Sequence, residues 1–105
     1  MNKAIFDIEM NKARFMKVVY NTETWSDNLK IHYWTGYIRG IRRVFHGEKF
    51  GTKKEHLLWL KAIKSIDAQR KERGKGYRDG LKVKDKKTAE LINDKKTLSK
   101  FFANL

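Results

Sequence analysis

Apolar side chains recur at helical spacing over residues 3–20, and they project onto one side of a helical wheel. The apolar positions are Ile5, Ile8, Phe15, Met16 and Val19, and the polar positions opposite are Lys3, Asp7, Asn11, Arg14 and Lys17. The pattern predicts an amphipathic helix. The β-prone run at residues 15–20 supports a competing interpretation, in which the N-terminal region is a β-hairpin that turns at residues 11–12.

A second helical pattern follows the polar connector at residues 21–28 and reaches about Phe45, with Ser26 or Asp27 as the predicted N-cap. Its broad apolar face comprises Leu29, Tyr33, Trp34, Tyr37, Ile38, Ile41 and Val44, and its polar face comprises His32, Thr35, Arg39, Arg42 and Arg43. Gly36 and Gly40 fall at the margin between these faces. A glycine there costs up to about 1 kcal/mol relative to alanine, which favours either close packing of another helix or close approach of a phosphate backbone.

The third pattern begins after a loop at residues 46–51 in which Gly47 ends the preceding helix. Thr52 and Glu55 match a capping box, so a helix is predicted to begin at Lys53. Its apolar stripe comprises Leu58, Trp59, Ala62, Ile63 and Ile66. We expect this helix to end within residues 69–73, before Gly74.

Residues 69–87 are rich in Lys, Arg and Gly and poor in apolar side chains. This composition predicts a basic segment that is mobile, forms a short helical turn at residues 77–81, or becomes ordered only on a partner. Thr88 is the predicted cap of a last helix, whose apolar side chains are Leu91, Ile92, Leu98, Phe101, Phe102 and Leu105. We expect this helix to dock on the others, with a homodimer contact through Phe101 and Phe102 as the alternative.

These elements together predict an all-α fold. It is one small basic domain over residues 1–105, a bundle of about four helices with a flexible basic segment. The chain contains no proline, which removes the strongest helix breaker, and no cysteine, which excludes disulfides and thiolate zinc sites.

The charge of the chain indicates its partner. Lys and Arg number 25 against 12 Asp and Glu, which gives a formal net charge of +13. Such an excess repels itself in a compact fold unless a polyanion neutralises it. No apolar stretch approaches the roughly 20 residues of a membrane-spanning helix, and acids interrupt the N-terminal apolar run, unlike a secretory signal. We therefore expect a cytoplasmic protein that binds RNA or DNA and no membrane.

The motif Gly-Tyr-x-x-Gly-apolar occurs at residues 36–41 and again at residues 76–81, each time among arginines and lysines. Bases stack on aromatic rings and guanidinium groups bind phosphates, so this mixture is typical of a nucleic-acid surface. Tyr37 and Phe50 are the rings predicted to be accessible. The predicted nucleic-acid-binding residues are Tyr37, Arg39, Arg42, Arg43, Lys53, Lys54, Arg70, Lys71, Arg73, Lys75 and Arg78.

Residues 36–63 resemble the ribosome modulation factor family, small basic bacterial proteins with a Gly-Tyr-x-x-Gly-apolar element and a later Trp-Leu helix. The matching elements at comparable spacing are Gly36-Tyr37, Gly40-Ile41 and Trp59-Leu60. The resemblance implies contact with ribosomal RNA through the residues around Tyr37 and Arg39 and through the basic helix that follows.

Two patterns invite a metal or catalytic interpretation. His46, Glu48, Glu55 and His56 flank one loop, but their spacing matches no finger or helical zinc pattern. Residues 6–9 resemble the first acidic motif of the DEDD exonucleases, whose carboxylates hold two metal ions, but the chain lacks the further acids and strands of that fold. No nucleophile triad, phosphate loop or dinucleotide motif is present. We predict a non-enzymatic protein without a metal or cofactor.

RNA is favoured over DNA because A-form RNA is read through shape, phosphate contact and stacking. DNA binding would use residues 53–70 as a recognition helix, although the preceding connector is longer than the turn of a helix-turn-helix motif. The alternative function is a small phage- or mobile-element-type regulator or inhibitor, anti-CRISPR-like, whose basic face binds a protein or nucleoprotein complex.

Overall fold

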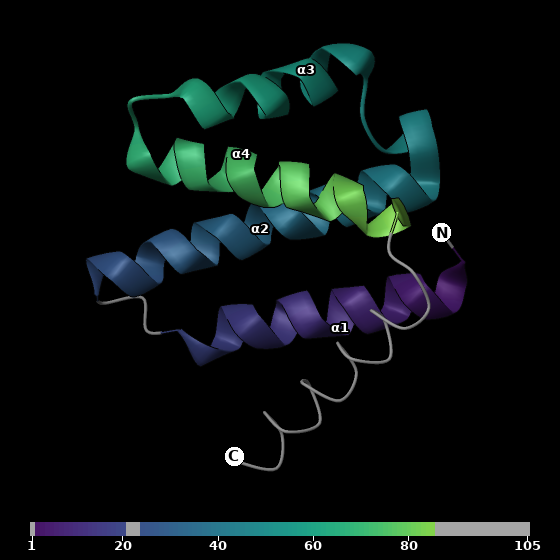
Figure 1. Cartoon of the computed structure of the whole chain (residues 1–105), viewed down its shortest axis with the longest axis horizontal. Coiled ribbons are helices and arrows are strands. Elements are labelled where there is room, and N and C mark those ends of the chain that lie inside the picture. The colour runs from purple at the N-terminus through teal and green to yellow at the C-terminus, as the bar shows by residue number, and fades with distance from the viewer. Residues whose placement is uncertain (1, 21–23, 86–105) are drawn as a thin grey trace.

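The computed structural model describes residues 2–20 and 24–85. Within these ranges the protein has no strand and four α-helices, which are α1 (Lys3–Val19), α2 (Trp25–His46), α3 (Lys53–Lys61) and α4 (Ala68–Leu81) (Figure 1). Short 3-10 helices follow three of them: η1 (Gly47–Phe50), η2 (Ala62–Lys64) and η3 (Lys82–Asp85). The all-α prediction is confirmed, and the alternative of an N-terminal β-hairpin is wrong.

Side-chain caps fix where the first two helices begin. The Asn2 side chain accepts a hydrogen bond from the backbone N–H of Ile5 at 2.9 Å, which starts α1. Thr24 caps α2 by accepting from the backbone N–H of Asp27 at 3.3 Å. The predicted caps Ser26 and Asp27 are therefore wrong by two or three residues, and both lie in the first turn of α2.

The start of α3 is confirmed. Thr52 Oγ1 accepts a hydrogen bond from the backbone N–H of Glu55 at 3.1 Å, as expected for the first half of a capping box. The helix is shorter than predicted because it ends at Lys61, and Ile66 beyond it is fully exposed. A helix from residue 53 to 70 is therefore wrong.

The crossing of α2 and α4 is the most extensive contact between elements of the described fold (Figure 1). A Cβ atom at Gly36 of α2 would overlap the carbonyl oxygen of Arg73 in α4, and a Cβ atom at Gly76 of α4 would overlap that of Tyr33 in α2. The C–H bond of each glycine therefore points at a carbonyl group of the other helix.

One turn further along, a second pair of glycines makes the same contact. A Cβ atom at Gly40 would overlap the carbonyl oxygen of Tyr77, and one at Gly80 would overlap that of Tyr37. Each of these glycine–carbonyl contacts has a counterpart in which both residues are displaced by 40 positions, so a local two-fold relationship links the two motifs. The glycines lie at the centre of a helix interface rather than at its margin. Close helix packing is confirmed, and these covered glycines offer no approach to a phosphate backbone.

The segment at residues 69–87 is helical over residues 69–85, well beyond the short helical turn predicted at residues 77–81. This stretch is α4 followed by η3, and it buries Gly74, Gly76, Gly80 and Tyr77. Its helix packs through glycine backbone, so it shows no apolar stripe in the sequence. The predicted last helix after Thr88 and the predicted dimer contact lie outside the described residues.

The hydrophobic core joins α1, α2 and η3. Its buried apolar residues are Met10, Ala13, Tyr37, Ile41 and Val83, with Ile5, Phe6, Trp34 and Ile38 packed against them. The predicted apolar face of α1 is rotated relative to this core, because Val19 is 44% exposed whereas Ala13 is fully buried. Glu9 is also fully buried in this region.

Candidate nucleic-acid interface

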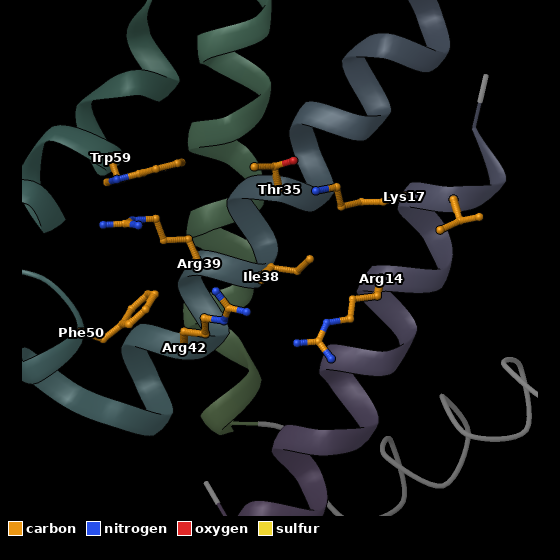
Figure 2. Close-up of a pocket in the computed structure, with 9 residues that line it drawn as sticks. Arg14, Lys17, Thr35, Ile38, Arg39, Arg42, Phe50 and Trp59 are labelled. Carbon is orange, nitrogen blue, oxygen red and sulfur yellow. The ribbon is translucent and has the colours of Figure 1, made fainter. Parts of the chain in front are cut away.

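An open groove of about 530 Å³ lies along one side of α2. Its lining residues come from α1 (Arg14, Lys17 and Val18), α2 (Thr35, Ile38, Arg39 and Arg42), η1 (Phe50) and α3 (Trp59). In Figure 2, α2 runs in front of α4 and forms the floor, with α1 on one side and Phe50 and Trp59 on the other. We call this concavity the basic groove.

Four cations converge on the basic groove from two helices. Arg14 and Lys17 are three residues apart on α1, as are Arg39 and Arg42 on α2, so each pair shares one face of its helix. Figure 2 shows Arg14 and Lys17 extending from α1 toward α2. None of the described lining residues is acidic, and within the described ranges no carboxylate forms an ion pair with Arg14, Lys17 or Arg42.

Arg39 is held in place by three groups. Its guanidinium carbon lies 5.2 Å from the ring centroid of Phe50 and 5.3 Å from that of Trp59, and in Figure 2 the guanidinium lies between the two rings. Arg39 Nη2 also donates to Glu55 Oε2 at 3.1 Å. Trp59 stacks in turn on Tyr77 of α4, with centroids 5.4 Å apart and ring planes 21° apart. The guanidinium therefore has little freedom to lose when it binds an anion.

Arg43 is outside the groove lining and has a structural contact. Its guanidinium donates to the carbonyl oxygen of Gly51, in a small cleft where α2, α3 and α4 meet. The bond ties the loop before α3 to α2. Arg43 therefore fixes the wall that carries Phe50 and Trp59, and it shares the small cleft with Arg39 without lining the basic groove.

The predicted basic residues beyond α2 do not join the basic groove. Lys53 and Lys54 lie exposed in the first turn of α3, and Arg70 and Lys71 lie exposed near the start of α4. Arg73 lines a separate hollow of about 230 Å³ with Arg70.

Two further predicted cations of α4 have acidic partners. Lys75 Nζ lies 3.2 Å from Glu72 Oε1, and Arg78 Nε lies 3.2 Å from Asp79 Oδ1. These partners reduce the positive charge that α4 offers to a ligand. Among the described residues, no acidic partner compensates the groove cations that come from α1.

Tyr37 is a correction to the predicted interface. Its side chain is 4% exposed, and its hydroxyl donates to Glu9 Oε2 at 2.6 Å inside the fold. Lys12 Nζ lies 3.0 Å from the same carboxylate oxygen. The Tyr37 ring is therefore covered on the inside of the fold and offers no platform for a base, which removes it from the predicted contact residues.

Histidines contribute little to the positive charge of the site. Burial lowers the pKa of His56 below its ordinary value, and the nearby Arg43 lowers it further. The His56 Nδ1 atom lies 2.6 Å from the hydroxyl of Tyr77. Burial, followed by Arg73, likewise lowers the pKa of His32. Both imidazoles are neutral near pH 7, so arginines and lysines supply the charge.

Arg14, Lys17 and Trp59 line the groove without having been predicted as contact residues. The wheel placed Arg14 and Lys17 on the polar face of the first helix. No sequence signal says that this face flanks the arginines of α2, because that depends on how the two helices pack. Trp59 belongs to the apolar stripe predicted for the third helix, and it is half-buried.

Residues of the possible zinc cluster and of the exonuclease-like motif at residues 6–9 have structural partners. Glu9 is bonded to Tyr37, Glu55 to Arg39 and His56 to Tyr77. Across residues 2–20 and 24–85, no three His, Asp or Glu side chains come together as a metal site would require.

None of the described helices is both long and apolar enough to cross a lipid bilayer. Comparison of the chain with protein-family models, with curated proteins and with solved structures found no match.

Proposed function

We propose that this protein binds nucleic acid without catalysing a reaction on it, and that it prefers RNA to DNA. The observation that carries the proposal is the convergence of Arg14, Lys17, Arg39 and Arg42 in one groove whose described lining includes no acidic residue. A net charge of +13 favours a polyanionic partner in general. A concave cluster of guanidinium and ammonium groups adds a place where neighbouring phosphates of one backbone can be neutralised together.

The shape of the basic groove favours RNA. Base readout in the major groove of B-DNA requires a helix or ribbon that protrudes into it. The cations here line a hollow between helices instead, and the short helix α3 forms a wall of that hollow through Trp59. A hollow fits around a backbone ridge, and structured RNA is bound largely through shape and phosphate contacts.

Ribosomal RNA is the finer form of this proposal. It is supported by the resemblance of residues 36–63 to the ribosome modulation factor family. Of the residues that the resemblance implies, Arg39 lines the groove whereas Tyr37 is buried. Contact would therefore run through the arginines of α2 and the α1 face beside them.

A pair of matched triple variants tests the proposal. Arg14→Ala, Lys17→Ala and Arg42→Ala together remove three groove cations but keep Arg39 and Arg43, which hold the loop and α3. Lys61→Ala, Lys64→Ala and Lys71→Ala remove the same charge from exposed positions outside the groove lining.

The binding assay is fluorescence anisotropy with an RNA hairpin and with a DNA duplex of the same stem sequence, at about 0.1 M salt. Loss of three phosphate contacts predicts that the groove variant binds the RNA about 100-fold or more weakly, and that the surface variant changes far less. Circular dichroism confirms that both variants remain helical. Equal losses in the two variants would refute the site, and tighter binding of the DNA would refute the RNA preference.

One observation favours the alternative of a protein-binding regulator. Leu57, Leu58 and Ile66 are exposed apolar side chains outside the basic groove, at 47%, 58% and 105% of their reference areas. Such side chains suit a protein interface. A salt titration separates the two functions, because six phosphate contacts lose roughly a thousandfold in affinity between about 50 and 200 mM salt, and an apolar interface loses far less.

A further inference from the structure

We infer that the basic groove binds the phosphate ridge of a double-stranded RNA and does not stack the bases of a single strand. This inference rests on the proposed nucleic-acid binding, and it specifies duplex RNA as the form that is bound. Proteins that bind single strands without sequence preference combine cations with open aromatic faces. The decisive question is therefore whether the rings of the groove are open to a base.

Each ring that lines the groove already has a guanidinium against it. Phe50 has Arg39 at 5.2 Å and Arg42 at 5.8 Å from its centroid. Trp59 has Arg39 at 5.3 Å and is stacked on Tyr77. A base that stacked on either ring would have to displace an arginine from it.

Displacing Arg39 would break further contacts. Its guanidinium lies between Phe50 and Trp59 (Figure 2). The same group donates to the Glu55 carboxylate at 3.1 Å. A base that entered between the rings would therefore separate an ion pair and expel a charge that the phosphates need. Tyr37, the other predicted stacking residue, is buried.

The rings have a different use in this arrangement. Aromatic faces attract guanidinium groups, so Phe50 and Trp59 hold Arg39 in a fixed position beside the groove. A guanidinium fixed in advance loses little conformational entropy when it binds a phosphate oxygen. The aromatic residues thus strengthen phosphate contacts rather than base contacts.

A binding mode limited to phosphates favours a duplex. Duplex DNA carries one charge per roughly 1.7 Å of axis. Each neutralised phosphate contributes about 0.9 to the slope of log affinity against log salt concentration for a duplex, and about 0.7 for a single strand. Extended to a duplex of RNA and to about four phosphates at 0.1 M salt, one for each cation of the basic groove, this difference corresponds to roughly sixfold in affinity. The bases of a duplex are already stacked on one another, so duplex binding loses no affinity when the protein has no open aromatic ring for a base.

The test uses the whole chain and three RNAs. A 20-base-pair RNA duplex and its two separate strands, chosen so that neither folds on itself, are compared by anisotropy in about 0.1 M sodium chloride. We expect the duplex to bind about sixfold more tightly than either strand. If a strand binds as tightly as the duplex, or more tightly, this preference is overturned while the proposed function stands. If none of the three RNAs binds, the proposed function itself fails.

A conservative variant supplies a second readout. Phe50→Leu keeps an apolar side chain in the wall and removes the aromatic face. Because Phe50 holds Arg39 for phosphate contacts, the affinities for the duplex and for the single strands should fall by the same factor. A loss for the single strands that exceeds the loss for the duplex by about tenfold or more would be the effect of a removed stacking platform, and it would overturn the inference.

Discussion

Gly36 of α2 lies directly against the backbone carbonyl group of Arg73 in α4, with no room for a methyl group between them. In the counterpart contact both residues are displaced by 40 positions, so that Gly76 lies against the carbonyl group of Tyr33. The repeated Gly-Tyr-x-x-Gly motif therefore builds the central helix crossing. Its glycines bring two backbones together, and the nucleic-acid contacts that we propose lie on the neighbouring face of α2.

Alanine at either glycine should destabilise the fold. In Gly36→Ala or Gly76→Ala the new Cβ atom meets backbone of the other helix, which cannot move aside without separating α2 from α4. We expect each variant to lose about 1 to 3 kcal/mol of unfolding free energy, the typical range of an overpacked core. Urea unfolding followed by circular dichroism measures the loss.

Gly51→Ala is the matched control for this substitution. A Cβ atom there would lie 3.3 Å from Glu55 Oε2, the end of an exposed side chain that can shift. The cost should stay below about 1 kcal/mol. If all three alanine variants unfold alike, the close crossing of α2 and α4 is not the interaction that holds the two helices.

Removal of the Tyr37 hydroxyl should reduce stability without affecting RNA binding. Tyr37→Phe leaves the buried Glu9 carboxylate without the hydrogen bond that it receives at 2.6 Å. Lys12 Nζ still lies 3.0 Å from the same oxygen, so the variant loses one hydrogen bond to a charged group, which is worth about 1.5 to 3 kcal/mol. RNA affinity at a temperature where the variant is folded should equal that of the wild type, since the ring lies inside the fold. Reduced affinity in the folded variant would mean that Tyr37 touches RNA.

Stability should fall as the solution becomes mildly acidic. The pKa values of His32 and His56 are lowered from 6.5 in the folded state, mainly by burial, so the fold prefers the neutral imidazoles. A lowered folded-state pKa gives stability that is present above pH 6.5 and lost as pH falls below it. Urea unfolding at several pH values between about 7.5 and 5.5 measures the fall. His56→Gln should show a shallower dependence, and an identical dependence would exclude His56 as its source.

The helices with polar and apolar faces were predictable from sequence, and α4 was not. Thr52 and Glu55 gave the start of α3 correctly because a capping box depends on four neighbouring residues. α4 packs through Gly74, Gly76 and Gly80, so its interface consists of backbone and leaves no hydrophobic periodicity. The one sequence signal for α4 was the second copy of the Gly-Tyr-x-x-Gly motif. The two copies pack against each other, and this packing requires both of them to be helical.

Only the α2 half of the candidate site was predictable from the sequence. The arginines Arg39 and Arg42 share one helix face, which a helical wheel shows. Arg14 and Lys17 face them from α1, and that juxtaposition follows from the packing of α1 on α2. Arg43 was grouped with its neighbours in sequence, but its bond to the Gly51 carbonyl group depends on the path of a loop.

The salt dependence of duplex RNA binding tests the basic groove most directly. The logarithm of the association constant is measured against the logarithm of the sodium chloride concentration for the wild type and for the variant with Arg14, Lys17 and Arg42 changed to alanine. If these three cations neutralise phosphates, the slope decreases in magnitude by about 2 to 3, whereas the Lys61, Lys64 and Lys71 variant keeps the wild-type slope. Identical slopes for the wild type and the groove variant would contradict phosphate binding in the basic groove.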